Sequence, residues 1–136
     1  MERTLDLLGF TAIGDVVNGL LVYRPDARQV AGEGGAVYVF VNPDGRVWKV
    51  GMTWKGFSRV DYTRVFDGRA MTRPHEQDKL RTIRSEVQDG ATQWVLRTDQ
   101  PELVEALLAT ILEPTESKRK ISKVERVLRE IRPAGT

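Results

Sequence analysis

The clearest hydrophobic pattern in the chain is a pair of short apolar runs, residues 36–41 (AVYVFV) and 47–52 (VWKVGM). Valine and aromatic residues favour the half-buried, pleated backbone of a β-strand. The intervening Asn42-Pro43-Asp44-Gly45 supplies turn residues. The pattern therefore predicts a β-hairpin with a short loop.

Downstream of the hairpin, helical and extended patterns alternate. Apolar residues at helical spacing predict helices, and a run of β-formers predicts a third strand beside the hairpin. Ser58 and Asp99 are candidate helix caps, and Pro101 suits the first turn of a helix. The expected elements are a helix over 57–66, a loop over 67–74, a helix over 76–88, a strand over 92–98, a helix from about 101 to 113, and a basic amphipathic helix over 118–131.

The first 34 residues carry weaker signals. A short helical turn is expected at 3–8 and a strand at 19–23, while 11–17 is ambiguous and 31–35 is a glycine-rich connection. We expect this region to pack against the sheet; contact with DNA and association with another chain are the alternatives. The predicted fold is α/β (α+β), a small, mainly antiparallel three-stranded sheet flanked by helices. Its parts are an N-terminal extension (1–34), a central domain (35–117) and a C-terminal basic amphipathic helix (118–136).

Composition narrows the possible classes of protein. The 136 residues include no cysteine, which excludes disulfides, thiolate zinc sites and cysteine nucleophiles and fits a reducing cytoplasm. No apolar run approaches the roughly 20 residues of a membrane-spanning helix. We therefore expect a cytoplasmic protein with no membrane partner.

The net charge is only +2, but positive charge is concentrated in two blocks. Between residues 55 and 84, eight basic residues stand against four acidic ones; between 118 and 132, seven stand against two. Such blocks suit a polyanion such as DNA, although solvated helix faces have the same composition.

Four residues of distinctive type stand in a regular order. Lys49 follows Tyr38 by 11 residues, Arg59 follows Lys49 by 10, and Glu105 lies within an apolar helical stretch. A carboxylate in such a stretch needs a partner, because burying its charge is costly. With Ala36-Val37-Tyr38 and Lys49-Val50-Gly51 as the two tripeptides, the set resembles the GIY-YIG nuclease superfamily over about residues 35–117.

The resemblance implies roles for these four residues. Tyr38 takes part in activating the nucleophilic water, and Lys49, which replaces the usual second tyrosine, lowers the pKa of Tyr38 or binds a phosphate oxygen. Arg59 binds the scissile phosphate, for which a guanidinium is well suited. Glu105 holds one divalent cation, Mg²⁺ or Mn²⁺, together with substrate oxygens and waters.

Supporting roles are expected for four further residues. Gly51 allows close approach of backbone or substrate. Tyr62 is a candidate second phenol, with core packing as the alternative. His75, the single histidine, is a helix-terminal residue without chemistry, a proton donor or a phosphate ligand. Ser117 stands where the family usually has asparagine.

Together these features predict a compact, stand-alone, metal-dependent endonuclease that hydrolyses phosphodiester bonds in DNA. The alternative is a catalytically inactive nucleic-acid-binding module of the same fold. The residues expected to contact DNA are Lys55, Arg64, Lys118, Arg119 and Lys120.

Overall fold

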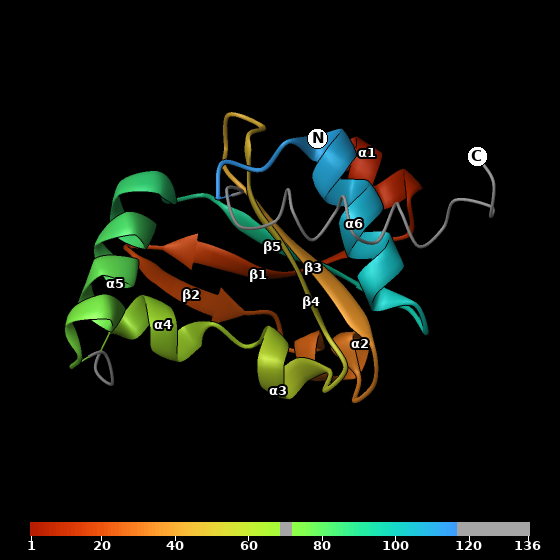
Figure 1. Cartoon of the computed structure of the whole chain (residues 1–136), viewed down its shortest axis with the longest axis horizontal. Coiled ribbons are helices and arrows are strands. Elements are labelled where there is room, and N and C mark those ends of the chain that lie inside the picture. The colour runs from red at the N-terminus through yellow and green to blue at the C-terminus, as the bar shows by residue number, and fades with distance from the viewer. Residues whose placement is uncertain (69–71, 117–136) are drawn as a thin grey trace, which may run out of the picture.

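The computed structural model describes residues 1–68 and 72–116, and its centre is a five-stranded sheet (Figure 1). Every strand pair in it is antiparallel. Across the sheet the order is β2 (Leu20–Tyr23), β1 (Thr11–Val17), β5 (Thr92–Arg97), β3 (Ala36–Val41) and β4 (Val47–Thr53). The antiparallel α+β class is thus confirmed.

Helices cover both faces of this sheet (Figure 1). On one face, α1 (Glu2–Leu7) and α6 (Pro101–Leu112) contribute Leu5 and Leu108 to a buried cluster. The helices of the second buried cluster are α2 (Ala27–Ala31), α3 (Phe57–Val60), α4 (Thr63–Asp67) and α5 (Pro74–Glu86). No helix in the described ranges is long and apolar enough to cross a membrane.

The side chains of strand β3 are divided between the two buried clusters. Because side chains alternate along a strand, Val37 and Val39 join the α1–α6 cluster while Tyr38 and Phe40 join the other. All six residues of β3 are buried. A strand covered on both faces reads as an unbroken apolar run, which is why this hairpin is the strongest signal in the sequence.

The prediction of three strands was wrong, because the first 34 residues extend the sheet. Strand β5 pairs with β3 on one side, as predicted, and with β1 on the other. Strand β1 was ambiguous because Gly14 and Asp15 interrupt its apolar pattern. The predicted strand near 19–23 is confirmed as β2, whereas α2 was not predicted.

The predicted helix over 57–66 is two short helices, α3 and α4, separated at Asp61 and Tyr62. Tertiary hydrogen bonds break it: the Gln93 amide donates to the Val60 carbonyl (2.9 Å), and the Tyr62 backbone N–H donates to the Tyr23 hydroxyl (3.1 Å). These bonds use backbone groups that a continuous helix would pair internally.

The other two predicted helices in the described ranges are confirmed as α5 and α6, with ends shifted by one or two residues. The proposed caps were wrong. The Ser58 hydroxyl donates to the Lys55 carbonyl, and α6 begins after Gln100, whose N–H donates to Thr98 Oγ1. The C-terminal helix predicted at 118–131 lies outside the described residues.

Candidate functional site

Two tyrosine hydroxyls meet inside the core on the face covered by α3, α4 and α5. Tyr38 lies in β3, and Tyr62 lies at the break between α3 and α4. Their hydroxyl oxygens are 2.8 Å apart, and both side chains are buried. The structure therefore brings the predicted second phenol directly to the first. It does so because the predicted helix is interrupted at Tyr62, which the sequence analysis did not anticipate.

Gly51 lies opposite Tyr38 on the neighbouring strand β4. An added Cβ at Gly51 would stand 2.6 Å from Cε2 of the Tyr38 ring, much closer than two carbon atoms can pack. The glycine therefore lets the ring of Tyr38 lie flat across β4. This is a close-approach role, as predicted for Gly51, but the approaching group is the tyrosine itself.

Lys49 lies two residues before Gly51 on β4, so its side chain leaves the same face of the strand, toward Tyr62. Its Nζ lies 5.6 Å from the centroid of the Tyr62 ring, and its side chain is only 14% exposed. The Nζ also lies 3.3 Å from Oε2 of Glu116. Lys49 thus interacts with a phenol and a carboxylate at the same time.

Glu116 reaches this position because the chain after α6 runs along the outer edge of β4. The backbone N–H groups of Thr115 and Glu116 donate to the carbonyls of Val47 and Trp48, at 3.0 and 2.9 Å. Glu116 Oε2 is buried and has no hydrogen-bond partner of good geometry among the described residues, and its 3.3 Å contact with Lys49 is an ion pair. Sequence analysis missed Glu116, because only folding brings it to β4.

Glu105 belongs to α6, and its side chain is 5% exposed. Its charge contributes to the electrostatic environment of Tyr38, where it helps to raise the pKa of the phenol. Helix α6, however, packs on the face of the sheet opposite Tyr38 and Tyr62.

The pKa of Tyr38 moves in the direction opposite to our expectation. Burial raises it most, and Tyr62, Glu105 and Glu116 raise it further. The predicted lowering by neighbouring cations was wrong, because an uncharged phenol is favoured in a buried place with two carboxylates nearby. Tyr38 therefore keeps its proton at neutral pH.

Lys49 keeps its charge at the same pH. Burial by itself would lower the pKa of Lys49, but the interactions with Tyr62 and Glu116 outweigh it, so that the pKa is raised. A buried, permanently charged ammonium group is a suitable partner for an anionic oxygen.

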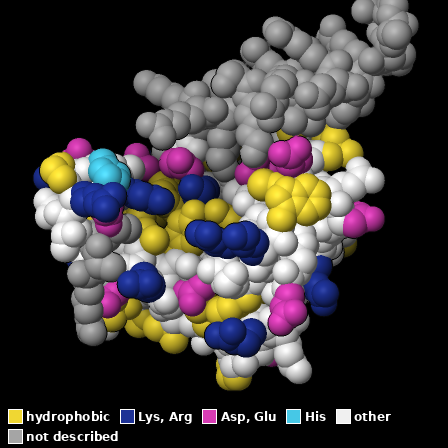
Figure 2. All heavy atoms as spheres, turned by 60° about the horizontal axis from the view of Figure 1, so that its bottom comes forward, with side chains coloured by type: hydrophobic (Ala, Val, Ile, Leu, Met, Phe, Trp, Pro, Cys, Tyr) yellow, Lys and Arg dark blue, Asp and Glu magenta, His cyan; other side chains and the backbone are white. Residues whose placement is uncertain are grey.

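Helix α5 forms a further wall beside this cluster. The Nζ of Lys79 lies 5.9 Å from the Tyr62 ring centroid, so two ammonium groups approach one ring. Between α5 and β4 lies a cavity of about 450 Å³, lined by Trp48, Lys49, His75, Lys79, Thr82 and Glu116. In Figure 2 the histidine, in cyan, borders a group of Lys and Arg side chains.

Tyr38, Tyr62, Lys49 and Glu116 form what we call the phenol cluster. The remaining predicted residues are not part of it. Arg59 lies on the exposed side of α3, and its guanidinium makes no hydrogen bond or ion pair with any described residue. Lys55 and Arg64 are also exposed. The other four predicted positions lie outside the described residues: Ser117, Lys118, Arg119 and Lys120.

The carboxylates of Glu105 and Glu116 are the groups that could hold a divalent cation. Within residues 1–68 and 72–116, no cluster of three or more His, Cys, Asp or Glu residues has the arrangement of a metal site. Mg²⁺ commonly takes only one or two carboxylates and completes its shell with waters and substrate oxygens. Glu116 Oε2 already pairs with Lys49 at 3.3 Å, so a cation here would have a single protein carboxylate, a number that Mg²⁺ accepts.

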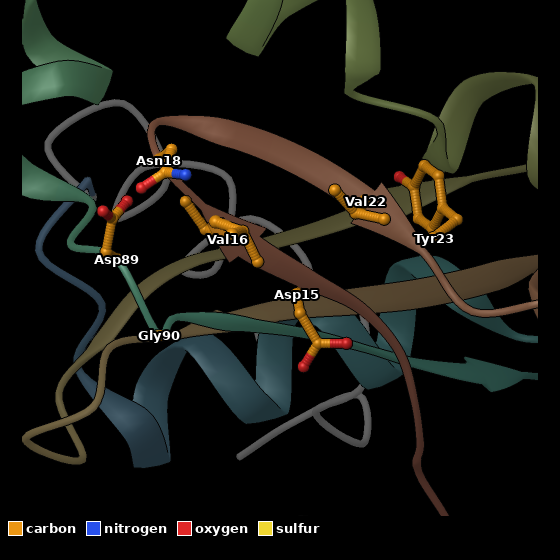
Figure 3. Close-up of a pocket in the computed structure, with 8 residues that line it drawn as sticks. Asp15, Val16, Asn18, Val22, Tyr23, Asp89 and Gly90 are labelled. Carbon is orange, nitrogen blue, oxygen red and sulfur yellow. The ribbon is translucent and has the colours of Figure 1, made fainter.

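A separate hollow of about 560 Å³ at the β1–β2 edge contains none of the predicted residues (Figure 3). Its two carboxylates, Asp15 and Asp89, lie well apart. Arg24 donates two 3.1 Å hydrogen bonds to Asp15, and Asp89 accepts the N–H of Gly19. Both acids thus have structural partners.

Comparison with protein-family models, curated proteins and solved structures finds no match to this chain.

Proposed function

We propose that this protein is a metal-dependent endonuclease of the GIY-YIG type that hydrolyses phosphodiester bonds in DNA. The observation that carries the proposal is the cluster of Tyr38, Tyr62, Lys49 and Glu116 beside the β3–β4 hairpin. A phosphate needs cations around it, and hydrolysis needs a metal-binding acid and groups that orient water.

The topology also supports the proposal. The β3–β4 hairpin, helix α3 with Arg59 and the later helix α6 with Glu105 follow one another along the chain. Strand β5 joins the hairpin at β3, and Glu105 lies on the helix that follows β5. The additional strands β1 and β2 lie beyond β5, on the side away from the hairpin.

In the proposed mechanism, the protonated Tyr38 donates a hydrogen bond that orients the attacking water. Lys49 stabilises the negative charge that develops on the phosphate oxygens, whereas Arg59, exposed on α3, is available only to contact the DNA backbone. Glu105 would hold Mg²⁺, which when bound would supply Lewis-acid stabilisation of negative charge on the phosphate. Glu116 keeps Lys49 in position.

The test is cleavage of supercoiled plasmid in the presence of Mg²⁺. Tyr38→Phe removes a hydrogen-bond donor and is expected to lower the cleavage rate by about 100-fold or more. Glu105→Gln is expected to abolish the response to Mg²⁺. Glu102→Gln is the matched control, because Glu102 lies on the same helix with an exposed side chain. Wild-type rates for both site variants would refute the proposal.

The second candidate is a nucleic-acid-binding module without catalysis. It is favoured by the ion pair between Lys49 and Glu116, which engages the ammonium group without substrate. A gel-shift experiment separates the two functions. Binding that weakens steeply with salt, with no cleavage under any divalent cation, would assign the module.

A further inference from the structure

The cavity between β4 and α5 has the shape and charge of a second binding site beside the phenol cluster. Its volume is about 450 Å³. His75, Lys79 and Thr82 form its α5 wall, at helical spacings that place them on one face. Lys49 and Glu116 form the wall toward β4.

Two ammonium groups give this cavity its character. Lys49 and Lys79 both approach the Tyr62 ring, at 5.6 and 5.9 Å. Lys79 is exposed and forms no ion pair with any described residue, whereas Lys49 contacts Glu116 on one side. An ammonium group has three N–H donors, so Lys49 retains donors for a ligand in the cavity.

The other lining groups are already engaged. The indole N–H of Trp48 donates to Glu86 at 2.8 Å, and the Thr82 hydroxyl donates to the Asp78 carbonyl at 3.0 Å. They offer no donor pattern that would read a base or a sugar. Because the Glu116 carboxylate in the lining pairs with Lys49, what remains for a ligand is the charge of Lys79, the other N–H donors of Lys49 and the ring nitrogens of His75, a combination that suits a compact anion.

We propose that this cavity binds a phosphate group of the polynucleotide, next to the phosphate that is cleaved. The inference rests on the proposed function in assuming a nucleic-acid ligand, and it adds Lys79 and His75 as ligands of a second phosphate. Lysine binds phosphate as a point charge that needs no fixed geometry, which fits its flexible stem and exposed position.

The single histidine of the chain makes the cavity directly observable. In a ¹H–¹³C NMR spectrum, the ring signals of His75 are followed during titration with inorganic phosphate or with thymidine 3′,5′-bisphosphate, at constant ionic strength and without metal. We expect a saturable shift with both ligands and tighter binding of the bisphosphate.

Lys79→Gln is the test variant and Arg84→Gln the control. Both side chains are exposed on α5, but Arg84 lines a different hollow, with Phe66 and Asp89. Lys79→Gln is expected to weaken phosphate binding by about tenfold, the effect of losing one charge-assisted hydrogen bond. Arg84→Gln is expected to leave it unchanged, and backbone amide spectra verify that both variants are folded.

Three results would overturn the proposal: no saturable shift, equal weakening by both variants, or equal affinity for the two ligands. Equal affinity would assign the cavity to free phosphate rather than to a strand. Plasmid cleavage is measured on the same samples. Cleavage without a His75 shift removes only the second phosphate site, whereas a shift without cleavage removes only the nuclease.

Discussion

Replacing Gly51 with alanine tests the close packing between β3 and β4 directly. The new methyl group would lie 2.6 Å from Cε2 of Tyr38, so the ring has to move. Because Tyr38 is buried among Phe40 and Tyr62, at ring-centroid distances of 6.2 and 5.4 Å, it has little room. Its hydroxyl then leaves the 2.8 Å contact with Tyr62.

The expected cost has two parts. Overpacking a well-filled core typically costs about 1–3 kcal/mol. Loss of a buried hydrogen bond adds about 1 kcal/mol. Gly51→Ala should therefore lower the free energy of unfolding by about 2–4 kcal/mol, which is a large part of the stability of a small domain.

Urea unfolding, followed by circular dichroism, measures this change. Gly34→Ala is the matched control, because a Cβ at Gly34 meets no atom within 4 Å. We expect the control to change stability by less than about 1 kcal/mol. A double-mutant cycle with Tyr38→Ala isolates the clash: without the ring, the penalty of Gly51→Ala should fall below about 1 kcal/mol.

The reasoning would be refuted if Gly51→Ala had wild-type stability while the Tyr38 and Tyr62 rings kept their contact in NOE spectra. A penalty that persists in the Tyr38→Ala background would also contradict it. Either result would mean that β4 tolerates a side chain at this position and that the glycine has no packing role.

Three further predictions concern ionisation and exposure. Burial raises the pKa values of Tyr23 and Tyr38 above the ordinary value of 10.0, so their contribution to stability is complete below pH 10 and falls above it, by about 1.4 kcal/mol per pH unit for each group. Tyr38→Phe should reduce the slope of unfolding free energy against pH by that amount in urea unfolding, and an unchanged slope would contradict it. Glu116→Gln should lower the free energy of unfolding by about 1 kcal/mol in the same assay, a modest value because Glu116 is 38% exposed and solvent screens its ion pair with Lys49. An unchanged free energy of unfolding at low salt would show that this ion pair contributes nothing to stability. Trp54 is 58% exposed, whereas Trp48 and Trp94 are 2% and 9% exposed, so acrylamide should quench mainly Trp54, and Trp54→Phe should remove the quenched component; persistence of that component would place another tryptophan at the surface.

The hairpin and its glycine could be predicted because their signals are local. Strand-forming residues flank a turn sequence, and a strand buried on both faces leaves an unbroken apolar run. The packing of Tyr38 on Gly51 was not predicted, because it depends on a register that shifts between Phe40 and Val41.

The rest of the candidate site depends on contacts between distant parts of the chain. Glu116 meets Lys49 only because backbone bonds hold residues 115 and 116 along β4. Tyr62 meets Tyr38 because tertiary bonds break a helix that local pattern favours. Burial then decides the direction of the Tyr38 pKa, and burial is a property of the assembled core rather than of neighbours in sequence.

The position of β5 has a consequence for how the protein folds. It stands between β1 and β3, so that the two hairpins made earlier in the chain are joined only through it. During synthesis, the edge of β1 in the first hairpin and the edge of β3 in the second therefore stay unpaired until residues 92–97 have been made. Unpaired strand edges can associate with other chains. A nascent chain stalled before residue 92 should be more prone to aggregation than the finished protein, and folding should be slow for a domain of this size because its central strand arrives late.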